Sequence, residues 1–247
     1  MVGALAALGI ALVAGVIGLS AAEGASAASG SAGVSRKPPG DTPWPLPTPT
    51  PTKTVAKPAT IQDPIPYGTT RRLQMAAYCR RHYGPAQATW ILKPKAVVLH
   101  YTGGGLYSSA HNYFAANTPT LGELPGATTT FIIDKNGRIY QQTPLRVRTR
   151  HTIGLNYCAI GIEFVQEGGS GPGWACDQIF DRRRQIRAGL RLVAWLRYKY
   201  KIPMKYIYGH GTANSSPLFK DLEGWRNDHV DWGPTSVRRF KELLRQM

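Results

Sequence analysis

Strand-like and helix-like patterns of apolar residues alternate along the chain from about residue 66 to the C-terminus. Short apolar runs, which are typical of buried strands, occur at 96–99, 128–133, 159–165 and 206–208. Longer segments with apolar residues at helical spacing occur at 69–84, 108–116, 177–200 and from Pro234 onward. Strands that alternate with helices predict an α/β domain in which helices flank a central mixed β-sheet.

Four features of this pattern make specific local predictions. The sequence Asp-Lys-Asn-Gly at 134–137 separates two strand-like runs, and Asn-Gly predicts a tight β-hairpin turn. The segment 177–200 is predicted to be a single helix whose apolar side carries Ile179, Ile186, Leu190, Val193 and Leu196. The first helix is expected to bury Leu73, Ala76, Ala77 and Tyr83. The last helix is expected to bury Val237, Phe240 and Leu244.

The N-terminus resembles an export signal. Residues 2–19 contain no charged side chain, and Ala25-Ser26-Ala27 supplies the small residues that a signal peptidase accepts. Residues 1–27 are therefore predicted to be a signal peptide. The alternative is an uncleaved membrane anchor, because the apolar run approaches the ~18 residues from which a spanning helix becomes possible.

A spacer separates this segment from the folded part. Residues 28–66 are rich in Pro, Thr and Ser and show no apolar periodicity, so they are predicted to be a disordered linker. The domain itself is expected at 67–247, where residues 67–92 form an N-terminal helical extension. This length is sufficient for one hydrophobic core.

Composition and charge limit the classes of protein and partner. With 43% hydrophobic residues and a mean hydropathy of −0.24 in 247 residues, the chain is neither a polytopic membrane protein nor wholly disordered. The formal net charge of +16 favours anionic partners. Nucleic acid is not expected, because the arginines of 177–200 are not interleaved with stacking aromatic residues. The three cysteines allow at most one disulfide, whose pairing among Cys79, Cys158 and Cys176 stays open.

Residues with chemical potential occur in or directly after the predicted strands. His100, Glu163 and His210 each occupy such a position, and Asp228-His229-Val230-Asp231 follows His210 closely. Two separated histidines and one carboxylate form the three-ligand zinc site that leaves a fourth position for water, as catalytic zinc requires. Spacing alone leaves a structural role for these histidines open, because the pattern is not a compact HExxH helix.

Five ordered motifs resemble one enzyme family. They are "VVLHYT", "TTTFIIDKNGRIYQ", "RHTIGLNYCAIGIEF", "IYGHGTANSSP" and "RNDHVDW", and together they cover about 93–247. This series resembles the type 2 zinc-dependent N-acetylmuramoyl-L-alanine amidases, which include amidase-type phage lysozymes. The animal peptidoglycan recognition proteins share the fold of that family, so the resemblance implies the same central mixed sheet.

The resemblance implies a zinc site. His100 of "VVLH" and His210 of "YGH" match the first two ligands. The family's third ligand is an Asp or Cys near the C-terminus, and "DHVDW" matches its Asp-His-x-Asp-Pro form with Trp232 in place of proline. Asp231 is therefore the expected third ligand, and Asp228 is the alternative.

The resemblance also implies roles for four further residues. Glu163 of "GIEF" matches the family's catalytic glutamate, which serves as general base and then as proton donor to the leaving amine. His229 matches a position where relatives carry a Lys or His, and a cation there would stabilise an oxyanion. His151 and Asn156 of "RHTIGLN" match residues that line the substrate groove, so both are expected to contact substrate.

The implied reaction is zinc-dependent hydrolysis of the amide between N-acetylmuramic acid and L-alanine in peptidoglycan. The expected partners are muramoyl peptides and anionic wall polymers, the expected location is secreted or cell-wall associated, and the expected state is a monomer with no membrane span after signal cleavage. Two alternatives stay open: a peptidoglycan-binding module without catalysis, and a zinc endopeptidase that acts on the stem peptide. The complete set of ligands together with Glu163 favours the amidase over the binding module.

Overall fold

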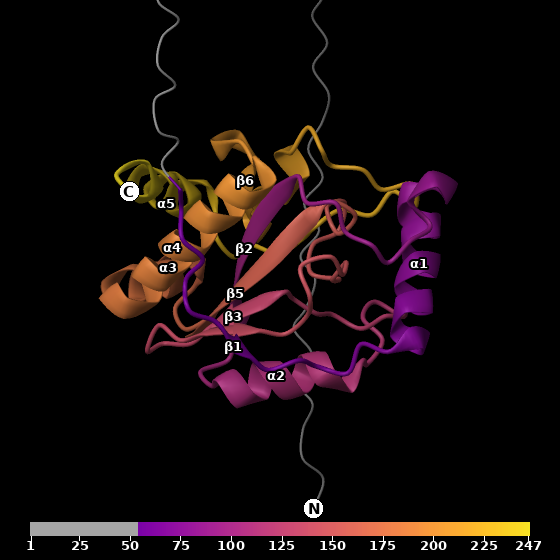
Figure 1. Ribbon diagram of the computed structural model, residues 1–247, viewed down its shortest axis with the longest axis horizontal. Coiled ribbons are helices and arrows are strands. Elements are labelled where there is room, and N and C mark those ends of the chain that lie inside the picture. Colours follow the sequence, from indigo (N-terminus) through magenta and orange to yellow (C-terminus); the bar gives the residue numbers. More distant parts are fainter. Residues whose placement is uncertain (1–53) are drawn as a thin grey trace, which may run out of the picture. The chain divides into compact units, whose positions relative to one another are not determined.

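A six-stranded sheet forms the centre of the molecule, which is known here from a computed structural model that describes residues 54–247. The strands follow the order β1-β4-β3-β5-β2-β6, and all neighbouring pairs are parallel except the β3–β4 hairpin (Figure 1). Their bounds are β1 Ile61–Gln62, β2 Ala96–Gly103, β3 Phe131–Ile133, β4 Ile139–Gln141, β5 Ala159–Glu167 and β6 Ile207–Gly209. The predicted mixed sheet, with its hairpin after residue 133, is confirmed.

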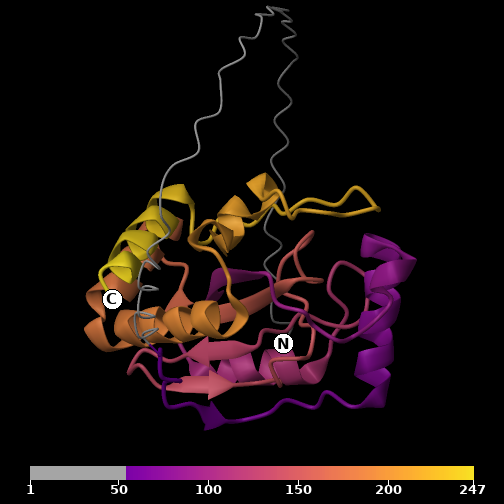
Figure 2. The ribbon, with the colours of Figure 1, turned by 45° about the horizontal axis from the view of Figure 1, so that its top comes forward.

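Helices cover both faces of this sheet. The bounds are α1 Thr69–Tyr83, η1 Pro85–Gln87, α2 Tyr107–Ala116, α3 Pro172–Asp181, α4 Arg183–Tyr200, η2 Met204–Tyr206, η3 His210–Ser215 and α5 Pro234–Arg245. Helices α3, α4 and α5 lie together on one side, whereas α1 and α2 lie apart from them (Figures 1 and 2). Within residues 54–247, no helix combines the length and the apolar character that crossing a bilayer requires.

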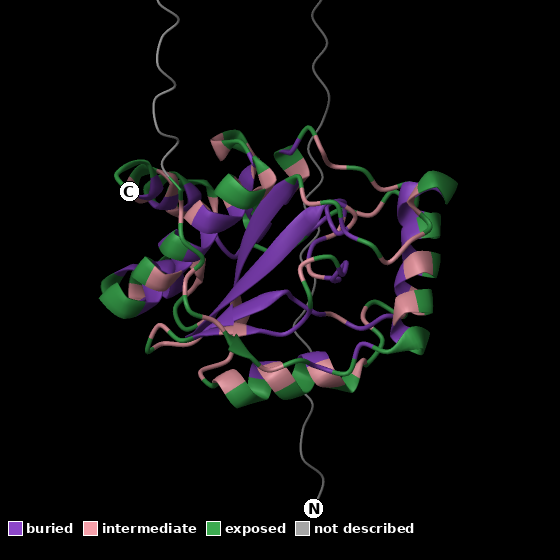
Figure 3. Cartoon of the chain, viewed as in Figure 1, coloured by how far each residue is buried: buried purple, intermediate pink, exposed green. Residues whose placement is uncertain are grey.

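The two faces of the central strands have different neighbours. Val97 and Leu99 of β2 and Phe164 of β5 belong to the main core, which they share with α3, α4 and α5. Because side chains alternate along a strand, Val98 and His100 project from the opposite face. Both strands are buried except at their C-terminal ends (Figure 3). The sheet therefore presents His100 on the side away from the main helical layer.

The long helix predicted at 177–200 is instead two helices. Helix α3 begins earlier, at Pro172, and the chain leaves the helical conformation at Arg182, where φ is −80° and ψ is 83°. Two residues into α4, the buried Gln185 donates from its amide nitrogen to the carbonyl oxygens of Ile133 and Val165. No Pro or Gly marks the break, which is associated with these contacts to β3 and β5, so periodicity alone predicted one continuous helix.

Helix α1 lies where it was predicted and buries Tyr83 as expected, but the rest of its buried face is different. Leu73, which was expected in the core, is 64% exposed, while Met75, Tyr78 and Cys79 are buried. His82 is also fully buried, and its Nδ1 and Nε2 lie 2.9 Å from carboxylate oxygens of Asp221 and Glu123. The imidazole of His82 thus contacts one carboxylate on each side, which ties α1 to two segments that are distant in sequence.

The predicted linker extends too far toward the C-terminus, because its last residues belong to the folded domain. Ile61 and Gln62 form β1, which pairs with β4, and Ile65 is buried at 4% exposure. Backbone pairing with a distant strand orders these residues, although their own sequence carries no apolar periodicity. The predicted signal peptide at 1–27 and the linker up to residue 53 lie outside the described residues.

Candidate metal centre and its pocket

The parallel pairing of β2 with β5 places His100 beside Glu163. The register aligns these two residues directly, so their side chains project from the same face of the sheet. Both are buried, with exposures of 2% and 8%. Backbone hydrogen bonds between two central strands thus fix the relative position of the imidazole and the carboxylate.

His210 and Asp231 reach the same place from the other edge of the sheet. His210 begins η3 directly after β6, and the amide of Gly211 donates to the carbonyl oxygen of Asp231 over 2.8 Å. The segment around Asp231 passes so close to β6 that a Cβ on Gly209 would lie 1.8 Å from the carbonyl oxygen of Trp232. Glycine at 209 is therefore required for this approach.

Trp232 anchors the segment that carries Asp231. Its indole is fully buried against Phe164, Phe180 and Phe240, and its Nε1–H donates to the carbonyl oxygen of His100 over 3.1 Å. Its φ of 53° is one that proline, restricted to about −65°, does not adopt. In this chain a tryptophan, bound to the backbone of the first histidine, occupies the place where the family pattern has proline.

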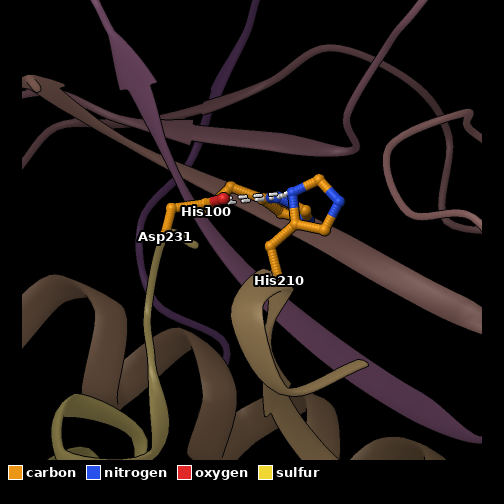
Figure 4. Close-up of side chains that lie close together, drawn as sticks. All are labelled: His100, His210 and Asp231. Carbon is orange, nitrogen blue, oxygen red and sulfur yellow. Dashed lines mark hydrogen bonds and ion pairs between the residues drawn. The ribbon is translucent and has the colours of Figure 1, made fainter. Parts of the chain in front are cut away.

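Three side chains converge at one point (Figure 4). The Nδ1 atoms of His100 and His210 lie 3.1 Å apart, and they lie 3.4 and 3.2 Å from the two carboxylate oxygens of Asp231. Within residues 54–247, His100, His210 and Asp231 are the group whose ligand atoms are close enough to hold a metal ion together. Asp228 is not part of it, because its side chain is 95% exposed, so the alternative third ligand is not supported.

Hydrogen bonds fix the tautomer of His210. The side chain of Asn227 accepts from the amide of Ile153 through Oδ1 and donates to the carbonyl of Ile153 through Nδ2, which fixes the orientation of its amide group. The same Oδ1 lies 3.0 Å from Nε2 of His210. Because an amide oxygen only accepts, Nε2 carries the proton, and Nδ1 keeps its lone pair toward Asp231.

His100 is held in the same way. Nε2 of His151 lies 3.3 Å from the carbonyl oxygen of Ala159 and donates to it, so Nδ1 of His151 is an acceptor. This atom lies 3.1 Å from Nε2 of His100, and the hydroxyl of Thr152 lies 3.2 Å from the same nitrogen. His100 therefore keeps its proton on Nε2 and directs the lone pair of Nδ1 toward His210.

This donor set fits a divalent cation. Two lone-pair nitrogens only 3.1 Å apart repel each other unless a positive charge lies between them. Tetrahedral zinc with ligand bonds of about 2.0–2.1 Å separates its ligand atoms by roughly 3.4 Å, close to the three distances observed. Burial, and then His210, lowers the pKa of His100 to about 4.

Glu163 has the properties of a proton-transfer group. Its Oε2 is buried and has no hydrogen-bond partner among the described residues. Burial, and then the charge of Asp231, raises the pKa of Glu163 well above its usual value. A carboxylate that has a raised pKa and an oxygen without a hydrogen-bond partner, beside a candidate metal site, is suited to accept a proton and to return it.

The remaining predicted site residues differ in their surroundings. The ring of His229 stacks on that of His210 at 4.3 Å between centroids, and its side chain is 63% exposed at the pocket. Burial against these neighbours, and then His210, lowers the pKa of His229, which favours a neutral ring over the expected cation. Its role toward an oxyanion stays a prediction.

His151 and Asn156 line the pocket, but their polar atoms are occupied within the protein. The ring of His151 supports His100 and stands over Gly161, where a Cβ would lie 2.7 Å from it. Oδ1 of Asn156 accepts from the amides of His151 and Thr152, and its Nδ2 donates to the hydroxyl of Tyr78. These contacts favour positioning roles, and direct substrate contact by either residue stays a prediction.

Two residues of the site, Asn227 and Thr152, had no role in the sequence analysis. Both lie in quoted motifs, "RNDHVDW" and "RHTIGLN", yet only the meeting of distant loops places them against the ring nitrogens. Their polar character in otherwise matched motifs is the one signal that the sequence offered.

We expect Asn227→Ala to lower the affinity for zinc by about 10–100-fold, as is usual when the partner of a ligating histidine is removed. His210 would lose the acceptor that keeps its proton on Nε2. Asn227→Asp keeps an acceptor at that place and should restore most of the affinity. Zinc titration of the metal-free proteins measures the effect, and equal affinities in the wild type and Asn227→Ala would contradict it.

The candidate metal ligands and Glu163 line one pocket of about 360 Å³. Its floor holds His100, Glu163, His210 and Asp231, and its walls are largely apolar. The apolar lining comes from α2 and from the loops near residues 121 and 153, through Leu106, Ala110, Tyr113, Phe114, Leu121, Ala127 and Ile153. A concave, mostly apolar pocket with a few convergent polar groups is the usual form of a small-molecule or active site.

Comparisons with known proteins show what this chain is similar to. Residues 91–234, more than half of the chain, match the family model described as N-acetylmuramoyl-L-alanine amidase. No curated protein matches in sequence. Similar solved structures include the endolysin amidase LysCS of Clostridium intestinale URNW, which is 17% identical with a TM-score of 0.47 over 77% of this chain and 98% of that one.

Two further structures show the range of likeness. A mutant endolysin from Bacillus subtilis is 18% identical, with a TM-score of 0.47 over 75% of this chain and 98% of that one. The peptidoglycan recognition protein SA of Apis mellifera is 19% identical, with a TM-score of 0.37 over 49% of this chain and 73% of that one. The match to the family model, which spans all four residues of the pocket floor, decides the family: this chain belongs to the N-acetylmuramoyl-L-alanine amidases and is an enzyme of that hydrolase family.

Proposed function

We propose that this protein hydrolyses the amide bond between the lactyl group of N-acetylmuramic acid and the L-alanine of the stem peptide, and that it requires zinc. The observation that carries the proposal is the convergence of His100, His210 and Asp231 beside Glu163 in one pocket. Membership of the amidase family supports the substrate. His100, His210 and Asp231 would hold the metal through Nδ1, Nδ1 and the carboxylate.

The metal, when bound, polarises the substrate carbonyl and lowers the pKa of water from about 16 toward 7. Glu163 takes the proton of the attacking water on its unpartnered Oε2. The carboxylic acid then gives this proton to the nitrogen of alanine, so that the amine leaves in neutral form. A raised pKa allows Glu163 to hold the proton between the two events.

The rest of the pocket would orient the substrate. His229 lies at the pocket and is exposed enough to donate an N–H to the oxygen that becomes negative. The apolar walls on the α2 side exclude water from the lactyl methyl and the alanine side chain. His151, Thr152 and Asn227 act indirectly, because they fix the rings of the two histidines.

The proposed location follows from the substrate. Hydrolysis of peptidoglycan requires that the domain reach the cell wall, and we propose that residues 1–27 direct export and that the segment after them serves as a spacer. Anionic wall polymers are proposed as partners because of the net charge of +16.

The ends that the enzyme releases distinguish this proposal from its alternatives. The full chain is incubated with purified sacculi, with a chelator, and with the chelator followed by zinc. We expect new N-terminal alanine amines and free lactyl carboxylates on muramic acid, lost with the chelator and restored by zinc. Intact muramoyl-alanine with cuts inside the stem peptide would indicate an endopeptidase, and binding without new ends would indicate a recognition module.

A further inference from the structure

A second pocket lies outside the active site and is lined by positive charge. It is about 360 Å³ in volume, lies between α5 and the segment of β6 and η3, and shares no lining residue with the pocket of the metal centre. Its walls carry three basic side chains and three hydroxyls, which belong to Arg238, Lys241, Arg245, Tyr208, Thr212 and Ser215. None of the described residues that line it is acidic.

The three basic residues form a row along α5. Arg238, Lys241 and Arg245 are spaced i, i+3 and i+7, so they share one face of the helix and extend over about 10.5 Å of its axis. Figures 1 and 2 show this helix at the surface, beside β6. A row of this length suits successive charges along a polymer better than one small anion.

These cations have no counter-charge in the part of the chain that the structure describes. Among residues 54–247, no carboxylate lies within ion-pairing distance of any of the three, although the adjacent Arg239 pairs with Asp177 over 3.0 Å. Lys241 is half-buried, with its Nζ 5.9 Å from the ring centroid of Tyr208. Burial, and then Arg245, lowers the pKa of Lys241. Three unneutralised cations around hydroxyl groups destabilise one another and favour a bound anion.

We propose that this pocket binds a polymer with repeating phosphodiester groups and so holds the enzyme to the anionic polymers of the cell wall. Guanidinium groups bind phosphate oxygens in a bidentate manner, so Arg238 and Arg245 at the two ends of the row suit successive phosphates. The binding does not depend on the hydrolytic activity, because none of these residues lies in the active-site pocket.

The lining favours a polyol phosphate over a nucleic acid. Single-stranded nucleic acids bind through aromatic side chains on which their bases stack. The one aromatic residue of this pocket is Tyr208, which is 7% exposed. Among the described residues, the pocket therefore offers positive charge for phosphates but no aromatic surface on which bases stack.

The test compares two triple variants of the full chain. Arg238→Gln/Lys241→Gln/Arg245→Gln removes the row, and Arg183→Gln/Arg187→Gln/Arg191→Gln removes the same charge from an exposed face of α4. The probe is poly(glycerol phosphate), with a single-stranded oligonucleotide of equal phosphate number for comparison. Binding is measured at several salt concentrations, and turnover is measured on a soluble muramoyl peptide.

We expect the α5 variant to bind the polymer at least tenfold more weakly, with a shallower salt dependence, and to keep wild-type turnover of the soluble substrate. The α4 variant should lose less than threefold in affinity. Equal losses in both variants would show that net charge alone attracts the polymer, and the proposal would fall. Oligonucleotide binding that equals polymer binding and is lost in the α5 variant would overturn it in favour of nucleic acid.

Discussion

Glu163→Gln is expected to retain zinc and to lose about 10²–10⁴-fold in turnover, the range that positioned proton transfer contributes. Glutamine keeps the shape of the side chain on β5 but neither accepts the proton of water nor returns it to the leaving amine. Turnover on sacculi and zinc content are measured on the same preparations. Glu167→Gln, at the exposed end of the same strand, is the matched control and should have wild-type activity.

Glu163→Gln should also be more stable than the wild type when both proteins lack metal. The pKa of Glu163 is higher in the folded protein than its ordinary value of 4.5, so folding favours the protonated form. The stability associated with this proton is complete below about pH 4.5 and is lost as the pH rises toward the raised pKa. Glutamine cannot ionise and escapes this loss.

The gain in the free energy of unfolding should therefore increase from pH 4.5 to pH 8 and reach on the order of 1–3 kcal/mol, the cost of an unsatisfied buried polar group. Urea denaturation with a chelator at several pH values measures it. If the free energies of unfolding of the two proteins had the same pH dependence, Glu163 would not be buried in ionised form. Wild-type turnover in Glu163→Gln would remove this residue from the mechanism.

Asp231→Ala is expected to lower the affinity for zinc by more than about 100-fold and to abolish turnover, because the loss of a ligand exceeds the effect of losing a ligand's hydrogen-bond partner. The change also leaves two imidazole nitrogens 3.1 Å apart without the carboxylate that faces both of them. Zinc titration and turnover on sacculi measure the two effects.

Asp228→Ala provides the control within the same motif. It removes the same charge three residues earlier, from a side chain that is almost fully exposed, and should change neither zinc binding nor turnover. If Asp228→Ala lost the metal and Asp231→Ala kept it, the third ligand would be wrongly assigned. Circular dichroism of both variants checks that each is folded.

Local sequence patterns correctly predicted those elements that are determined by their own residues. The Asn-Gly turn gave the β3–β4 hairpin, and the apolar run before His100 gave β2. Helix α5 buries Val237, Phe240 and Leu244 as its periodicity indicated. In each case the residues that determine the structure are neighbours in sequence.

The features that the sequence did not reveal depend on distant partners. Strand β1 exists because Ile61 and Gln62 pair with β4, and the break before α4 accompanies the contacts of Gln185 with two strands. The contact by which Asn227 supports His210 joins residues that are 17 positions apart in the sequence. The motifs indicated the candidate site residues. The tautomers of the two histidines, and the preference for Asp231 over Asp228, depend on contacts that only the folded structure shows.

The aligned register of His100 and Glu163 separates chemistry from specificity in this protein. The relative position of these two residues follows from the backbone pairing of β2 with β5, and His151 and Thr152 add the orientation of the His100 ring. The loop around Leu121, which lines the pocket but carries no metal ligand and no proton-transfer group, can therefore be exchanged for that of a relative. Such chimaeras would change which wall fragments are cleaved while the distance over which the proton moves is inherited intact.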